Sequence, residues 1–279
     1  VLDPNQWSVE GTEALDWYYP DRQGRRLAFG RSSGGDELSR LRVMDVDSGA
    51  TLEEIPHTRA CSLAWLPDGS GFYYTRYPAP DTVPVGHAQY HRRVFFHSLG
   101  TDPAVDDPVF GEGREPEDWP GVHLSQEGRH LLVSVAVGWT RTDLYLLDRS
   151  TGRWTTLVEG EEALYHGELY RGHLYLHTNS TAPNYRLLRV DITDPDRERW
   201  REILPEGPDV LESVGIVGGQ LFASYLVDAT SRLDRFDLDG GSRTRIPLPT
   251  LGSLGGLGGE WDGLELFYSF TSFTVPPTV

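Results

Sequence analysis

Residues Gly30 to Gly34 read Gly-Arg-Ser-Ser-Gly, which matches the Gly-x-Ser-x-Gly pattern around the nucleophile of many serine hydrolases. The chemistry requires a helix directly after the serine, because the sharp strand-to-helix turn holds its hydroxyl exposed. Here a polar turn and a further alternating apolar segment follow Ser32. We therefore interpret the match as a chance occurrence and expect no catalytic residue in this chain.

Histidine, cysteine and glycine occur without the spacing of a metal, redox or phosphate site. His87, His91 and His97 are close in sequence but lack a helical carboxylate-backed pattern, so surface or hairpin histidines are expected and no metal. Cys61 is the single cysteine and lies in an apolar segment, which favours a buried structural thiol. The glycines between 252 and 259 read as a flexible connection without a strand-to-helix context. The sequence predicts no cofactor.

Aromatic residues offer a binding surface rather than catalysis. Trp119 and Trp139 lie between Glu115 and Arg141, where glycines make the strand pattern less regular. Packing in the core or between sheets is one interpretation of these tryptophans. The other is an apolar wall that binds peptides, with Arg141 donating hydrogen bonds to peptide carbonyls.

Composition excludes several partners. A formal net charge of −17 argues against nucleic acid and anionic membrane surfaces, both of which need clustered basic residues. No stretch is long and apolar enough to span a membrane, and Val1 to Pro4 do not resemble a signal peptide. We expect a soluble, monomeric, cytoplasmic protein, with the periplasm or secretion as alternatives.

Beyond these residues, one local pattern recurs six times along the chain. A turn rich in Asp, Glu and Gly leads into a short alternating apolar segment, and the turn glycines are Gly24, Gly69, Gly128, Gly172, Gly219 and Gly263. Their spacing is about 44 to 47 residues with one gap of about 59, which is typical of propeller blades. The wide gap contains the proline-rich connection from Tyr77 to Gln89, either a surface loop or one that faces a ligand.

Each period contains further alternating apolar segments separated by hairpin turns. Examples are Leu41–Val46, Thr51–Ile55, Leu63–Trp65 and Asp143–Leu147. Four strands per period without helical periodicity predict an all-β fold of four-stranded antiparallel blades. We expect about five complete blades and the opening strands of a sixth, with Trp65, Phe72, Leu132, Tyr175 and Phe222 packed between them.

Several longer segments carry a family resemblance that runs nearly end to end. They are Leu2–Asn5 with Glu10–Thr12, Ala64-Trp65 with Asp68-Gly69, Phe72-Tyr73 with Tyr77-Pro78, Leu99–Asp102, Ser180 with Pro183–Arg186, and Phe267-Tyr268 with Phe270–Phe273. With these segments the chain resembles the β-propeller domain of the prolyl oligopeptidase (prolyl endopeptidase) family.

The resemblance implies a seven-bladed propeller in a serine peptidase that cuts short peptides after proline. It places the Ser-Asp-His triad in a separate α/β-hydrolase domain, C-terminal to the propeller and outside this chain. Residues 1–279 are then a propeller domain incomplete at both ends. In the family this domain caps the active site and screens out folded proteins.

The resemblance also marks positions that contact substrate, and this sequence departs from the family at each. The family's arginine falls on Ala136, its cysteine on Trp139, its phenylalanine on Ala60 and its methionine on Trp119. The subsite beyond proline is then rebuilt with tryptophan, and Arg141 is a candidate replacement for the missing arginine.

Three other function classes each have recognisable sequence features. A non-enzymatic scaffold would carry repeated Trp-Asp or Gly-His blade signatures, and a glycan-acting propeller would carry Ser-x-Asp-x-Gly-x-Thr-Trp boxes. A related dipeptidyl peptidase or oligopeptidase is the third alternative, although the matching segments favour the proline endopeptidase branch.

Overall fold

The structure, a computed structural model, describes all residues from Val1 to Val279 and contains two compact units. The first unit comprises residues 1–139 and 143–159, and the second comprises residues 140–142 and 160–279. Strands dominate both units, which confirms the all-β prediction. The helical segments are four single turns of 3-10 helix: η1 (Pro4–Gln6), η2 (Pro80–Thr82), η3 (Pro103–Val105) and η4 (Arg197–Arg199).

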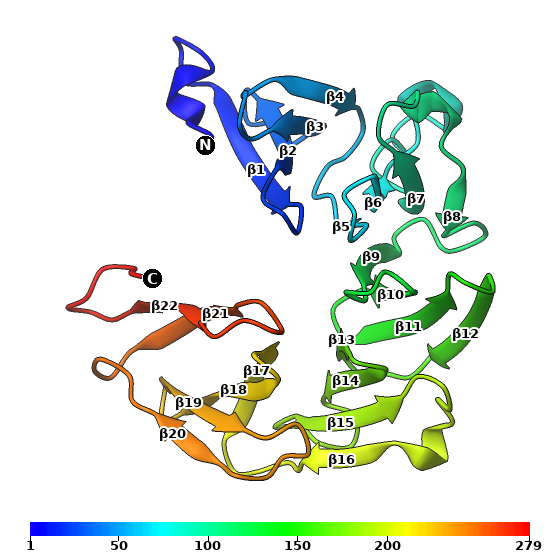
Figure 1. Ribbon diagram of the computed structural model, residues 1–279. Helices are drawn as coiled ribbons and strands as arrows, with labels where there is room; N and C mark the ends of the chain where they lie inside the picture. Colours follow the sequence, from blue (N-terminus) through cyan, green and yellow to red (C-terminus); the bar gives the residue numbers. More distant parts are fainter. The chain divides into compact units, whose positions relative to one another are not determined.

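The first unit contains three antiparallel four-stranded sheets, each built from strands consecutive in sequence (Figure 1). The first sheet is β1 (Glu13–Pro20), β2 (Arg26–Ser33), β3 (Arg40–Asp45) and β4 (Thr51–Ile55). The second is β5 (Leu63–Trp65), β6 (Gly71–Arg76), β7 (Arg93–Ser98) and β8 (Pro108–Phe110). The third is β9 (Trp119–Leu124), β10 (His130–Val137), β11 (Arg141–Asp148) and β12 (Arg153–Val158).

The second unit contains two four-stranded sheets and one two-stranded sheet. They are β13 (Tyr165–Tyr170), β14 (His173–Thr178), β15 (Arg186–Asp191) and β16 (Arg201–Leu204), then β17 (Val210–Val217), β18 (Gln220–Val227), β19 (Thr230–Phe236) and β20 (Thr244–Ile246), then β21 (Ser253–Gly258) and β22 (Phe267–Thr271). Five four-stranded sheets and the opening pair of another agree with the strands expected from the sequence. The seven blades of the family's domain stay a prediction.

The recurring glycine turns have the backbone that the hairpins need. Five of the six turn glycines have φ between 66° and 77°, a region that residues with a Cβ rarely adopt: Gly24, Gly69, Gly128, Gly172 and Gly219. A Cβ on Gly128 would also lie 2.7 Å from Cδ of Pro67. Gly263 is not among the glycines with positive φ. The strand expected to begin at Leu264 begins only at Phe267.

Two sequence interpretations were wrong about strand regularity. The region from Glu115 to Arg141 is not irregular, because β9 and β10 pair without interruption from Leu124 opposite Leu131 to Trp119 opposite Ala136. Gly255, Gly256 and Gly258 are not in a flexible connection, because they lie in β21, which pairs with β22 through one register shift. Glycine weakens the strand pattern in sequence but takes part in backbone pairing like any other residue.

The first unit's core forms where neighbouring sheets face each other. Phe72 and Tyr74 of the second sheet are fully buried against apolar side chains of the first sheet such as Leu41 and Ile55. Trp65 packs on the Phe72 ring at 4.9 Å and donates from its indole Nε1 to the carbonyl oxygen of Tyr19 at 3.0 Å. The packing predicted for Trp65 and Phe72 is confirmed.

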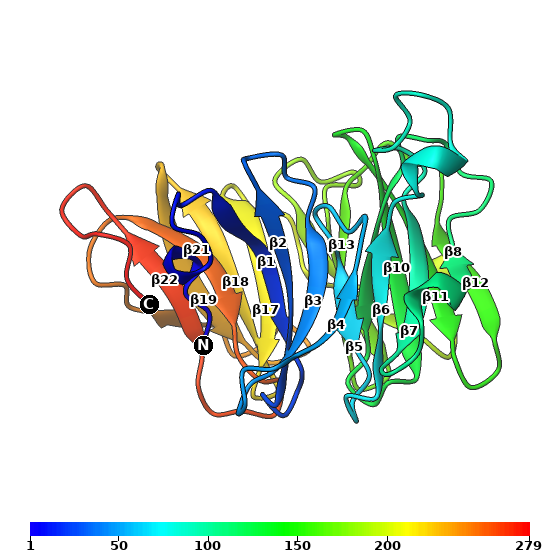
Figure 2. The same ribbon diagram turned by 90° about the horizontal axis from the view of Figure 1, so that it is seen from above.

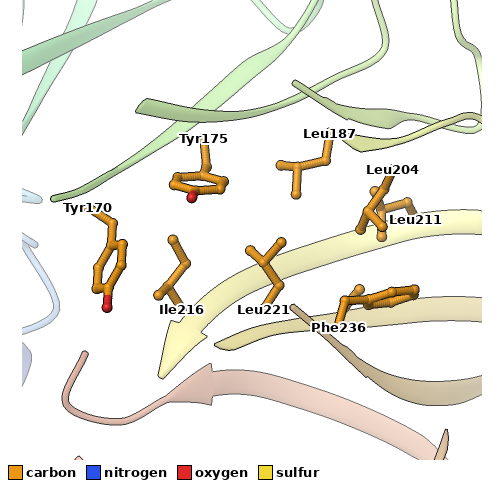
Figure 3. Close-up of a cluster of buried hydrophobic side chains, with 9 residues drawn as sticks. Tyr170, Tyr175, Leu187, Leu204, Leu211, Ile216, Leu221 and Phe236 are labelled. Carbon is orange, nitrogen blue, oxygen red and sulfur yellow. The ribbon is translucent and has the colours of Figure 1, made fainter. Parts of the chain in front are cut away.

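The second unit's core has the same construction between its two four-stranded sheets (Figure 3). Tyr175 and Leu187 come from one sheet, and Leu211, Leu221 and Phe236 come from the next; all five side chains are buried. Burial of such large apolar side chains stabilises the fold by about 1.5–3 kcal/mol each. Tyr175 therefore has the packing role that the sequence predicts.

A buried ionic network joins the first two sheets of the first unit. The imidazole of His97 on β7 is fully buried, with Nε2 2.7 Å from a carboxylate oxygen of Glu53 on β4. Its Nδ1 lies 3.0 Å from both carboxylate oxygens of Asp106, one of which also accepts from the hydroxyl of Tyr74. A carboxylate only accepts, so both contacts are hydrogen bonds only when the imidazole carries two protons. The sequence predicts a surface or hairpin location for His97. The surface location is wrong, because the side chain is fully buried.

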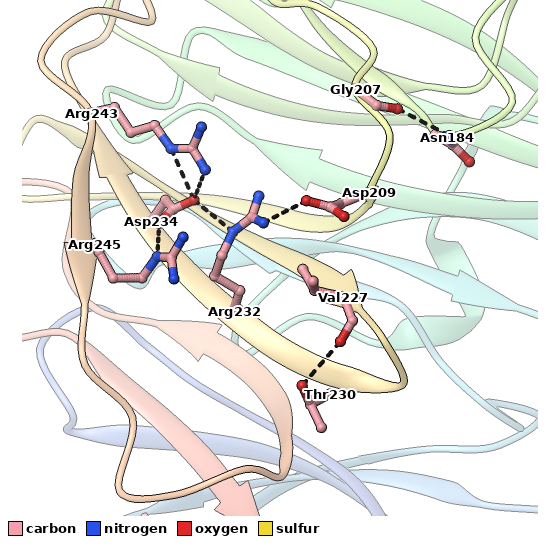
Figure 4. A network of polar contacts seen from close by, with 9 residues as sticks. All are labelled: Asn184, Gly207, Asp209, Val227, Thr230, Arg232, Asp234, Arg243 and Arg245. Carbon is pink, nitrogen blue, oxygen red and sulfur yellow. Dashed lines mark hydrogen bonds and ion pairs between the residues drawn. The ribbon is translucent and has the colours of Figure 1, made fainter.

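The second unit contains a carboxylate surrounded by arginines (Figure 4). Asp234 on β19 is fully buried and accepts from Arg232 at 3.0 Å, from Arg243 at 2.7 and 3.1 Å, and from Arg245 at 2.7 Å. Burial alone would raise the pKa of Asp234, but the hydrogen bonds from Arg245 and Arg243 outweigh it and leave the pKa below its usual value. Arg232 also pairs with Asp209 at 2.5 Å.

Glu168 on β13 gives the second unit a pH-dependent stability. Burial raises the pKa of this carboxyl from 4.5 to about 7, although Ile216 of β17 donates its backbone N–H to it at 3.2 Å. Because the folded pKa exceeds the unfolded one, the folded state binds more protons between these values, and stability falls as pH rises from 4.5 to 7.

We expect Glu168→Gln to abolish this loss of folding stability with rising pH, because glutamine keeps the hydrogen-bond acceptor and never ionises. The expected difference is roughly 2 kcal/mol after allowance for the partial exposure of Glu168. Urea unfolding at pH 5 and pH 8 measures it, with the exposed Glu212→Gln as control. Equal pH dependence in Glu168→Gln and the unmodified protein would show that Glu168 does not ionise in this range.

Candidate functional site

Two of the predicted binding residues, Trp119 and Trp139, lie at the ends of strands in the first unit's third sheet, next to its second sheet. β6 ends at Arg76, β7 begins at Arg93, and β9 begins at Trp119, with β5 and β6 packed against β9. The connection between β6 and β7 extends beyond the strand ends in Figure 2. It is fixed to the chain before β9, since the N–H of His91 donates to the carbonyl oxygen of Pro116 at 2.8 Å.

Trp119 forms a partly open aromatic surface at this edge. It is 41% exposed, and its backbone is held in the β9–β10 ladder opposite Ala136. The buried ring of Tyr77 meets the indole edge-on at 6.3 Å. The guanidinium of Arg92 lies over the indole at 4.5 Å, which fixes the ring by a cation–π contact. One flank of the ring is therefore supported while part of it stays in solvent.

Arg92 connects three segments at this edge. Its Nη2 donates to the carbonyl oxygen of Ala60 at 2.8 Å and to the hydroxyl of Thr75 at 2.6 Å. Ala60 has a φ of 45°, an uncommon conformation for a residue with a Cβ. The arginine thus joins the turn before β5, the end of β6 and the start of β9. Sequence reasoning missed Arg92 and the support from Tyr77, because contacts between sheets leave no periodic signal.

Trp139 is the most exposed tryptophan at this edge. It lies in the turn between β10 and β11 after Gly138, and 95% of its surface is accessible. An indole left in water has no packing role, so the packing alternative is excluded for Trp139 and holds only in part for Trp119. Arg141 is the first residue of β11 and is grouped with the second unit. Its part in the site stays a prediction.

The serine in the Gly-x-Ser-x-Gly match has no nucleophile geometry. Ser32 lies inside β2, is buried, and donates to a carboxylate oxygen of Asp16 at 2.9 Å. Ser39 donates to the other oxygen of that carboxylate at 2.5 Å. A strand continues through the serine where an elbow needs a turn and a helix, so the match is a coincidence of sequence.

The remaining candidates for chemistry have structural roles. The rings of His87 and His91 stack at 5.8 Å, and no group of three or more His, Cys, Asp or Glu side chains has the arrangement of a metal site. Cys61 is buried, and burial raises the pKa of its thiol to about 11, which makes it a poor nucleophile.

No helix in the structure has the length and apolar character required to cross a membrane.

This arrangement offers aromatic contact area, and neither Ser32 nor Cys61 is an activated nucleophile. Two indoles on neighbouring segments offer apolar faces and N–H donors at one edge of the unit. Peptide recognition of this kind combines aromatic contact area with a few directed hydrogen bonds.

Comparison with known proteins places the whole chain in one family. The sequence model of the prolyl oligopeptidase N-terminal β-propeller domain matches residues 1–279. A prolyl endopeptidase from Elizabethkingia meningoseptica is 31% identical over all of this chain and 40% of its own length. Prolyl oligopeptidase A from Galerina marginata is 28% identical over all of this chain and 41% of its own length. The chain thus spans about two fifths of the curated relatives it matches.

Solved structures agree with the sequence comparison. A structure from a study of two prolyl endopeptidases and their inter-domain dynamics superimposes with a TM-score of 0.94 at 34% identity, covering 99% of this chain and 41% of that one. Prolyl oligopeptidase B from Galerina marginata, bound to a 25mer macrocyclization substrate, gives a TM-score of 0.89 at 21% identity over the same shares, which shows the fold alone. This chain belongs to the prolyl oligopeptidase family and forms its N-terminal β-propeller domain.

Proposed function

We propose that the whole protein is a serine endopeptidase that cuts short peptides after proline, and that this chain is its gating and substrate-selecting domain. The observation that carries the proposal is the match of all 279 residues to the propeller of a family whose matched relatives are named prolyl endopeptidases. The buried Ser32 without a histidine partner supports a nucleophile supplied by an α/β-hydrolase domain of the same protein.

In this proposal Trp119 and Trp139 line the subsite beyond proline, with Arg141 as a donor to peptide carbonyls. Trp119 and Trp139 are exposed tryptophans at one end of the third sheet, and the Arg92 guanidinium lies 4.5 Å from the centre of the Trp119 ring. The protein acts as a monomer in the cytoplasm, on proline-containing peptides small enough to pass the propeller.

Cleavage-site mapping tests the proposed activity. The whole protein is incubated with a short peptide containing a single internal proline and with the same peptide carrying alanine at that position. We expect products that end in proline from the first peptide and none from the second. Equal cleavage of both peptides, or no cleavage of either, would exclude a prolyl endopeptidase.

Replacing Trp139 by alanine tests the substrate-lining role. In the whole protein, kcat/KM for long peptides should fall roughly tenfold, about 1.4 kcal/mol, while short chromogenic substrates are cut nearly as before. Stability should change little, because the side chain is almost fully exposed. The matched control is Trp154→Ala, at the opposite end of the third sheet. It should leave kcat/KM unchanged for both the long peptides and the short substrates. Equal loss on both substrate classes would assign Trp139 no part in peptide binding.

A further inference from the structure

Arg92 is a buried cation without an acidic partner. Only 4% of its surface is exposed, it forms no ion pair, and its Nε and Nη1 atoms are buried without a hydrogen-bond partner. Burying a charge is costly unless a counter-charge lies near, so a buried arginine is ordinarily paired with a carboxylate. Its two hydrogen bonds go to neutral acceptors, the Ala60 carbonyl and the Thr75 hydroxyl. The positive charge is therefore uncompensated within the protein.

The acidic side chains closest in sequence to Trp119 do not neutralise this charge. Asp118 is buried but is occupied by Arg114, whose Nε donates to it at 2.7 Å. Glu115 and Glu117 are exposed, so water and salt screen them. Arginine stays ionised at neutral pH even where burial lowers its pKa, as it does for Arg92.

The uncompensated charge lies over one face of a partly exposed aromatic ring. The guanidinium carbon is 4.5 Å from the centroid of Trp119, a ring that is 41% exposed. An indole already engaged with a cation on one face binds a second cation poorly, because the two like charges repel across the ring. Neutral and acidic side chains experience no such repulsion.

We propose that Arg92 is a positioning and specificity-determining residue, which fixes the Trp119 ring and makes its open surface discriminate against peptides that place lysine or arginine there. The inference rests on the proposed function, since it concerns the peptide that the same surface binds. Arg92 does not contact the peptide. It acts by positioning the Trp119 indole and through the electrostatic field of its guanidinium.

A lysine scan of the substrate tests the proposal on the whole protein. A proline-containing peptide is prepared with a single lysine at each successive position around the proline, each paired with a glutamine peptide of equal length. We expect one position at which lysine lowers kcat/KM about fivefold relative to glutamine, the effect of two like charges one ring apart. Glutamate at that position should be cut at least as well as glutamine. Equal rates for lysine and glutamine at every position would overturn the inference.

Three variants assign the lysine penalty to Arg92. Arg92→Met and Arg92→Gln should abolish the penalty, whereas Arg92→Lys keeps the charge and should retain it. The Thr75 hydroxyl still accepts from the N–H of Ser62 at 2.9 Å in each variant, and no carboxylate loses its partner. Arg93→Met removes the same charge next to Arg92 and should leave the penalty unchanged. A penalty that persists in Arg92→Gln or Arg92→Met would contradict the assignment.

The same measurements separate this inference from the proposed activity. If no proline peptide is cut at all, the proposed function fails. If glutamine peptides are cut after proline but lysine carries no penalty, the activity stands and only the role of Arg92 is wrong.

Discussion

Asp234→Ala is expected to lower the free energy of unfolding by about 3 kcal/mol. The substitution removes a fully buried carboxylate that accepts hydrogen bonds from three arginines, and leaves their charges crowded without the shared anion (Figure 4). Breaking a buried ion pair from one side typically costs 3–5 kcal/mol. We place the value at the lower end, because Arg243 and Arg245 are about half exposed and regain water.

Urea unfolding of the variant and of two relatives measures the effect. Asp234→Asn keeps the shape of the side chain and one acceptor oxygen, so its free energy of unfolding should fall by less, about 2 kcal/mol. Asp237→Ala removes an exposed carboxylate three residues along the chain and should stay within about 0.5 kcal/mol of the unmodified protein. A loss below about 1 kcal/mol for Asp234→Ala would mean that the arginines need no shared carboxylate.

His97→Leu should destabilise the first unit by about 3 kcal/mol, since two largely buried carboxylates then lose the imidazole that both of them contact. The side chains of Glu53 and Asp106 are 14% and 4% exposed, so water replaces the imidazole poorly. Urea unfolding of the variant and of the unmodified protein measures the loss.

Second-site variants distinguish charge from packing in this network. Adding Glu53→Gln to His97→Leu should recover part of the loss, about 1 kcal/mol, by removing one of the two buried charges. His173→Leu, a partly exposed histidine outside the network, should change stability by less than about 1 kcal/mol. If Glu53→Gln recovers none of the stability lost in His97→Leu, the cost is lost packing rather than lost charge.

Periodicity in the sequence predicts most of the strands because alternation of side chains survives wherever one face is buried. The hairpins at Gly24, Gly69 and Gly128 follow from a backbone that favours glycine. The pattern is weakest at β9 and β21, where glycines interrupt the alternation of side chains. Leu124 of β9 and Leu254 and Leu257 of β21 still face the core, and the backbone of both strands is paired. The pattern also places the start of β22 three residues early.

The candidate site was only partly predictable. The exposed indoles of Trp119 and Trp139 could be identified from their types and from the family resemblance. Arg92, Tyr77 and Ala60 could not, because their contacts join β5, β6 and β9 across two sheets, and separation along the chain hides such contacts. The partners of His97 are likewise 9 and 44 residues away in sequence.

In the proposed function, this chain selects substrates by size for a proline-specific active site outside it. The most direct test is kcat/KM of the whole protein toward a short proline peptide, a long unstructured peptide and a folded protein with an exposed proline. We expect cleavage after proline that falls with substrate size and vanishes for the folded protein, with no cleavage by residues 1–279 alone. Comparable cleavage of the folded protein and the short peptide would contradict the account.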